Sequence, residues 1–207
     1  MSEFTFGDNS YKIKSAVITG RLADPYWCDT YNRGKGKELA WFFIFEAKRR
    51  RDDKEDDDKP PQVQLDGDLG IQVASWKDLE GVMVKWKHPI NKRSGERYGM
   101  TWDYYHAFIC KGQLAVGHRT GTRFYVEASG IDENNAAFTI NANARFTGIT
   151  VHGSEHDTDE TVRERLARHI SLQSLCVAPF ELFDHEDMPP GDNGVRIGCA
   201  HFQPQDS

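Results

Sequence analysis

The residues from 137 to 147 alternate strictly between apolar and polar side chains, and this pattern constrains the fold more than any other feature of the sequence. The apolar set consists of Phe138, Ile140, Ala142, Ala144 and Phe146. Successive side chains of a β-strand point to opposite faces, whereas those of a helix return to one face about every 3.6 residues. The alternation therefore predicts a strand with one face in a core and a hydrogen-bonding face on the other side.

Similar patterns recur along most of the chain. The most apolar one, LAWFFIFEA at residues 39–47, predicts a central core strand. Residues 63–73 predict a hairpin, because Asp66-Gly67 suits the positive φ angles of a tight turn between alternating strands. Further strands are predicted at residues 11–22, 82–88, 101–110, 113–117, 122–127 and 195–202, of which the three between 101 and 127 are expected to be adjacent and antiparallel.

One helix is predicted, at residues 161–175, where Thr161 and Glu164 have the spacing of a capping box. Residues 48–61, KRRRDDKEDDDKPP, change from a basic to an acidic block and cannot bury apolar area, which predicts a mobile charged excursion. We therefore predict one mainly β domain over residues 1–207. Its expected architecture is a β-sandwich or distorted barrel of about ten short strands with one amphipathic helix near the C-terminus.

Composition limits the compartment and the kind of partner. No apolar run approaches the ~18 residues of a membrane span, so no membrane association is expected. The four cysteines are far apart and form no Cys-x-x-Cys pair, which favours reduced thiols in a cytoplasmic protein over the alternative of two long-range disulfides in an exported one. The net charge of −6 disfavours bulk adhesion to polyanions, so a polyanion contact would have to be local.

Positive charge is concentrated between Lys85 and Tyr125. This segment carries eight Lys or Arg and two acids, a formal charge of +6 in a chain whose total is −6. Aromatic residues lie among the cations, and the combination of phosphate-binding cations with stacking rings is typical of nucleic-acid-binding proteins. We predict Lys85, Lys87, Lys92, Arg93, Arg97, Arg119 and Arg123 as phosphate contacts and Tyr98, Tyr105 and Tyr125 as stacking platforms.

A short segment near the N-terminus also resembles part of a nucleic-acid-binding protein family. Thr19-Gly20-Arg21-Leu22, followed by Asp24-Pro25, resembles the opening strand of the OB-fold in bacterial single-strand DNA-binding proteins. The resemblance covers about ten residues and does not extend downstream. It implies an OB-like barrel that binds single-stranded nucleic acid.

Two alternatives to a nucleic-acid-binding protein remain open. In the first, the basic face meets an acidic partner surface, and the chain is a protein-interaction or assembly subunit, with self-association as one form of this alternative. In the second, His152-Gly-Ser-Glu155-His156 matches the written form of the His-x-x-Glu-His metalloprotease motif, which predicts a divalent-metal hydrolase centred on His152 and His156. Gly153 and Ser154 argue against the helix that this motif needs. With no nucleophile elbow and no Walker loop in the sequence, a non-enzymatic protein without a cofactor is favoured.

Overall fold

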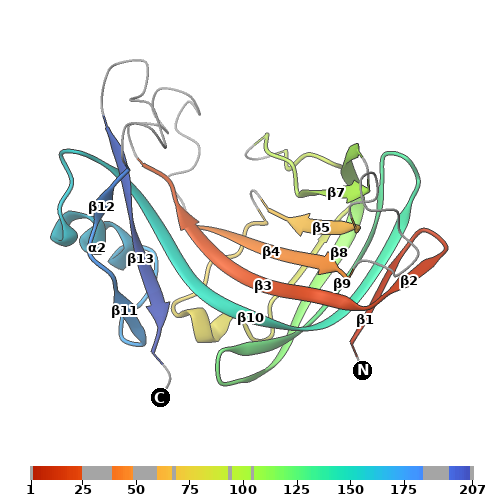
Figure 1. Cartoon of the computed structure of the whole chain (residues 1–207), viewed down its shortest axis with the longest axis horizontal. Coiled ribbons are helices and arrows are strands. Elements are labelled where there is room, and N and C mark those ends of the chain that lie inside the picture. The colour runs from red at the N-terminus through yellow and green to blue at the C-terminus, as the bar shows by residue number, and fades with distance from the viewer. Residues whose placement is uncertain are drawn as a thin grey trace. The chain divides into compact units, whose positions relative to one another are not determined.

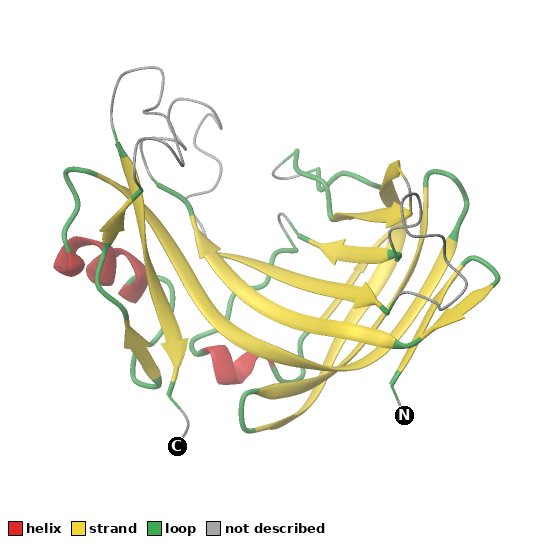
Figure 2. Cartoon of the chain, in the orientation of Figure 1, coloured by secondary structure: helices red, strands yellow, loops and turns green. Residues whose placement is uncertain are grey.

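Strands dominate the computed structural model of the chain (Figures 1 and 2). It describes residues 2–24, 39–48, 60–66, 69–92, 95–103, 105–183 and 196–205. The strands are β1 (Glu3–Phe6), β2 (Asn9–Tyr11), β3 (Ile13–Leu22), β4 (Ala40–Ala47), β5 (Gln62–Leu65), β6 (Met83–Trp86), β7 (Gly99–Asp103), β8 (Tyr105–Thr120), β9 (Arg123–Asp132), β10 (Ala137–Ser154), β11 (Leu175–Val177), β12 (Glu181–Leu182) and β13 (Ile197–Pro204). The helices are the 3-10 turn η1 (Trp76–Leu79) and the α-helix α2 (Asp159–Ala167).

All of these strands belong to one 13-stranded sheet. Its main path is β11-β13-β10-β3-β4-β5-β7-β8-β6, and β9 pairs with both β8 and β10. The pairing order that starts at β10 and passes through β3, β4, β5, β7, β8 and β9 therefore returns to β10. This confirms the predicted class, a mainly β chain of sandwich or distorted-barrel type.

The chain divides into two compact units. The first unit contains residues 1–18, 41–71 and 77–146, and the second contains residues 19–40, 72–76 and 147–207. Whether the whole chain behaves as one domain stays a prediction. The charged excursion predicted at residues 48–61 falls mainly outside the described residues.

The core of the first unit is formed by the apolar side chains that alternate with polar ones along its strands. The apolar residues of β10 from Phe138 to Phe146 are all buried, and Phe43 and Phe45 of β4 are fully buried. Gly130 of β9 is the cross-strand partner of Phe138. A Cβ at Gly130 would lie 2.7 Å from the Phe138 ring, so only glycine lets this ring pack directly on the sheet.

In the second unit, the end of β10 pairs with β13, and β13 also pairs with β11 and β12. Helix α2 buries Val162 and Leu166. Trp76 is buried as well, and its indole nitrogen donates a hydrogen bond of 2.7 Å to the Ser174 hydroxyl. None of the described helices is long and apolar enough to cross a membrane.

The structure corrects two of the strand predictions. Residues 69–73 form no strand, because β5 pairs with β4 and β7 and not with the segment that follows it. The predicted strands 101–110 and 113–117 are also not separate, since β8 continues through Lys111 and Gly112. The segment 101–110 is instead a hairpin of β7 with the start of β8. Strand β8 also pairs with β9 through two register shifts, at Ile109/Lys111 and Val116/Arg119.

The helix is shorter than predicted and begins earlier. Its N-cap is Thr158, which exchanges side-chain to backbone hydrogen bonds with Thr161 in a capping box. The predicted capping box of Thr161 and Glu164 is therefore wrong by three positions. Helix α2 ends at Ala167. Beyond it the backbone forms hydrogen bonds outside the helix, since the Ser171 N–H donates to the Ala74 carbonyl.

Candidate functional site

The outer face of the first unit carries an ordered set of exposed side chains on β9 and β10, which lie side by side in Figure 1. Arg123 lies directly opposite Arg145, and Tyr125 lies opposite Asn143. Arg123, Tyr125, Asn143 and Arg145 are all exposed, and they alternate with buried residues on both strands. This strand pair therefore presents two adjacent cations followed by an aromatic ring and an amide.

The start of β3 joins this face and completes an open groove of about 530 Å³, which we call the basic groove. Four cations line it, and none of the described lining residues is acidic. Three of these cations were not predicted from the sequence, and only Arg123 was. The lining residues are Ser2, Lys12, Ile13, Lys14, Ser15, Ala16, Val17, Arg123, Ala142, Asn143 and Arg145.

One of these cations has an acidic neighbour outside the groove. The Lys14 ammonium lies 3.2 Å from a Glu46 carboxylate oxygen, which also accepts a 3.0 Å hydrogen bond from the Ser15 hydroxyl. Because the Lys14 side chain is 61% exposed, this pair contributes little to stability and leaves most of the ammonium accessible. The Arg123 guanidinium donates a 3.3 Å hydrogen bond to the Asn143 carbonyl, a neutral acceptor.

The position of the two arginines is chemically suited to an anion. Like charges directly opposite each other on adjacent strands destabilise a sheet. Arg123 and Arg145 occupy such a position at the lip of the basic groove. A bound anion between them would replace this repulsion with charge-assisted hydrogen bonds, for which guanidinium groups and phosphate oxygens are well matched.

Tyr125 lies next to the basic groove and is 37% exposed, which is unusual for a large ring in this structure. Its ring lies beside Gly117 of β8, where an added Cβ would be 3.4 Å from ring carbon Cδ1. The ring therefore rests against the sheet surface, in the space that glycine leaves. An exposed ring held in this way can serve as a stacking platform.

A second groove of about 330 Å³, which we call the polar groove, lies on the same unit. Its described polar contacts are few: the Gln113 amide donates to the Ser129 hydroxyl at 3.2 Å, and the Asn141 amide donates to Glu3 at 3.3 Å. It contains cationic, anionic, amide and hydroxyl groups together with Met83, which is 68% exposed. The lining residues are Met83, Lys85, Gln113, Leu114, Ala115, Glu127, Ala128, Ser129, Thr139 and Asn141.

The structure distributes the predicted site residues over several places. Arg123 lines the basic groove and Lys85 lines the polar groove, whereas Lys87 and Lys92 are exposed and line neither. Arg97 also lines neither groove, because its guanidinium lies 3.0 Å from the centre of the Phe108 ring in a cation–π contact.

Four further predicted residues contact the protein itself or are not described. Tyr98 is half-buried and stacks on Trp86 at 5.3 Å, so one of its ring faces is covered. Arg119 donates a 2.6 Å hydrogen bond to the Gly121 carbonyl. Arg93 and the side chain of Tyr105 lie outside the described part of the chain. The predicted segment therefore contributes Arg123 and Tyr125 to the basic groove and its margin, and the other cations there come from β10 and from the start of β3.

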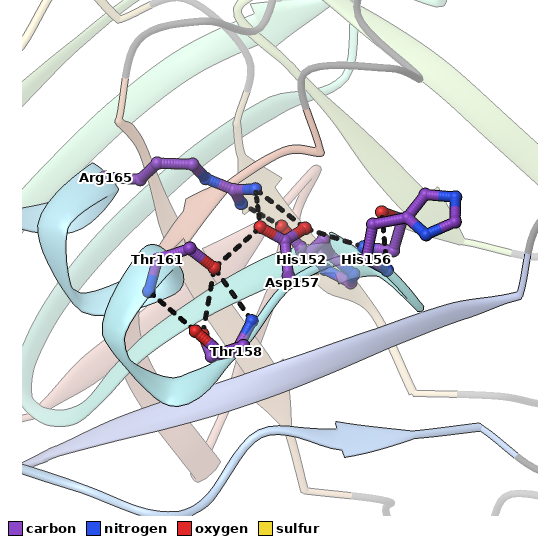
Figure 3. Close-up of polar contacts among 7 residues, drawn as sticks. His152, His156, Asp157, Thr158, Thr161 and Arg165 are labelled. Carbon is purple, nitrogen blue, oxygen red and sulfur yellow. Dashed lines mark hydrogen bonds and ion pairs between the residues drawn. The ribbon is translucent and has the colours of Figure 1, made fainter.

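The two histidines of the proposed metal motif lie in the second unit (Figure 3). Burial, followed by the charges of Arg21, His201 and Arg165, lowers the pKa of His152 to about 4. His156 lies in an exposed turn beyond the end of β10. Among the residues that the structure describes, no group of three or more His, Cys, Asp or Glu side chains is placed to hold a metal ion.

Asp157, between the motif and helix α2, has a structural role. Its carboxylate lies 3.3 Å from the Arg165 guanidinium, and both side chains are 16% exposed. The same carboxylate accepts hydrogen bonds from the Thr161 hydroxyl and the Ser154 backbone N–H. Arg165 also donates to the His152 carbonyl, so this network fastens the end of β10 to the helix (Figure 3).

Comparisons of the chain with models of known protein families, with curated proteins and with solved structures find no match, so the likeness to single-strand DNA-binding proteins rests on the residues of that one segment alone.

Proposed function

We propose that the chain is a non-enzymatic binding protein whose basic groove holds phosphate groups of a nucleic acid strand. The observation that supports this proposal is the convergence of four cations, two from the β9–β10 hairpin and two from residues 12–14, on a groove whose described lining has no carboxylate. A groove of this kind follows the phosphate backbone without reading base sequence.

The alternatives fit the groove less well. An acidic protein surface offers carboxylates that two opposed arginines would also bind, and it could pack on the exposed Tyr125 ring, but it requires no base-sized flat partner there. Stacking of a nucleobase on this ring explains why cations and an aromatic side chain lie together.

The proposal is tested by fluorescence anisotropy with a labelled short mixed-sequence single-stranded oligonucleotide, titrated over a series of salt concentrations. If all four groove cations contact phosphates, the slope of log K against log salt should be about −2.8, from −0.7 per contact on single strands. The double variant Lys12→Ala/Arg145→Ala should weaken binding at low salt and reduce the size of the slope by about 1.4.

A matched control comes from Lys87→Ala/Lys92→Ala, which removes the same formal charge from exposed positions that line neither groove. This control should leave the slope close to that of the wild type. Equal weakening by both double variants would show a diffuse charge effect and contradict a phosphate site in the basic groove. Competition by poly-glutamate at the potency of the oligonucleotide would instead favour the acidic-partner function.

A further inference from the structure

The basic groove and the polar groove are both lined by residues of β9 and β10. On β9, Arg123, Tyr125 and Glu127 follow one another on one side of the strand, and Glu127 lies opposite Asn141 of β10. Alternate residues of an antiparallel strand are ~6.8 Å apart, so the arginine pair and the Glu127–Asn141 pair are separated by ~14 Å. Tyr125 lies midway between them. This arrangement leaves separate places for a phosphate at the arginine pair, a stacked base on Tyr125 and the edge of a second base at Glu127.

The polar groove has the wrong chemistry for a second phosphate. Glu127 is exposed on the groove wall, and no described side chain forms an ion pair or hydrogen bond with its carboxylate. An ionised carboxylate only accepts hydrogen bonds and repels phosphate, so within a nucleic acid strand it is matched by an uncharged base group with N–H donors and not by the phosphate. Amino groups of nucleobases are such donors, and Glu accepting from the cytosine N4 amine is an established pairing in base recognition.

Several uncharged groups of the polar groove suit the same ligand. Asn141 and Gln113 place amides on either side, and an amide side chain offers both donors and acceptors to a base edge. Met83 adds an exposed, flexible apolar side chain, which packs readily against a flat ring. The alanines of the lining, Ala115 and Ala128, leave space between the longer side chains.

Resting on the function proposed above, we propose that the polar groove is a base-binding subsite that selects an amine-bearing base, cytosine first, through Glu127. A neighbouring base stacks on Tyr125, and the phosphate between them lies in the basic groove. Because a base in a duplex has its edge paired and its faces stacked on neighbours, the ligand is single-stranded. Thymine and uracil, which offer a carbonyl where cytosine has its amine, are disfavoured.

The test compares labelled oligo-dC, oligo-dT and a duplex of the same length, by anisotropy at one low salt concentration. The wild type should bind oligo-dC about tenfold more tightly than oligo-dT, as expected for one good base contact. Glu127→Ala should abolish this preference by weakening oligo-dC alone. Tyr125→Ala should weaken both oligonucleotides about tenfold, through lost stacking. Asp8→Ala, which removes an acid from an exposed position that lines neither groove, is the matched control and should keep the preference.

The failures of the two proposals are distinguishable. Equal binding of oligo-dC and oligo-dT by the wild type, or a preference that survives in Glu127→Ala, overturns the base-binding subsite. In that case the Lys12→Ala/Arg145→Ala variant still decides whether the basic groove holds phosphates. Tighter binding of the duplex than of either single strand also overturns the subsite, and absence of binding to all three ligands overturns both proposals.

Discussion

Replacing His152 with glutamine should make the stability of the protein less sensitive to acid. His152 lies half-buried on β10, where burial is the main cause that lowers its pKa from 6.5 to about 4. The nearby charges of Arg21, His201 and Arg165 lower it further. Protonation of this imidazole is therefore much less favourable in the folded chain than in the unfolded one.

The sign and size of the effect follow from proton linkage. Between pH 6.5 and pH 4 the unfolded chain binds a proton at His152 that the folded chain does not, so stability is lost as the pH falls through this window. The full shift corresponds to at most ~3 kcal/mol, and partial solvent exposure of the ring reduces it. Between pH 7 and pH 5 we expect a loss of about 1 to 2 kcal/mol that is specific to His152.

The assay is urea unfolding of the wild type and of His152→Gln at several pH values between 7 and 5, with the difference in unfolding free energy plotted against pH. His156→Gln, at an exposed position four residues away, is the matched control and should follow the wild type. A wild-type minus His152→Gln difference that does not change with pH would refute the reasoning. So would an NMR titration in which the His152 ring protonates near pH 6.5 in the folded protein.

Three further predictions concern packing, capping and thiol reactivity. Gly130→Ala should lower the free energy of unfolding by about 2 kcal/mol, because the added Cβ would collide with the Phe138 ring. An unchanged midpoint of urea denaturation would contradict this prediction. Thr158→Ala should cost about 1 kcal/mol through loss of the helix N-cap, which thermal unfolding would measure, whereas Thr158→Ser should retain most of the stability. Burial raises the pKa of the Cys199 thiol, so iodoacetamide should alkylate Cys199 more slowly than exposed Cys176 at neutral pH. Peptide mass spectrometry would measure the two alkylation rates, and equal rates would contradict this prediction.

The sequence alone was sufficient where structure depends on local pattern. The alternation from Phe138 to Phe146 correctly separated the buried face of β10 from its exposed face, because a strand's side-chain period is fixed by backbone geometry. The presence of one helix after residue 157 was also predictable, although Thr158 and not Thr161 is its cap. Both residue types cap helices well, and only the backbone conformation distinguishes them.

The candidate site depended on strand pairing, which no local pattern specifies. Lys12 and Lys14 meet Arg123 and Arg145 because the start of β3 lies against β10, more than a hundred residues away in the chain. Because the prediction followed charge density along the sequence, it selected Lys87 and Lys92 as phosphate contacts, although they line neither groove. The sequence determined which side chains are exposed on each strand, since burial follows the two-residue period. The tertiary structure alone decided which exposed side chains are neighbours, because non-local pairing sets the order and register of the strands.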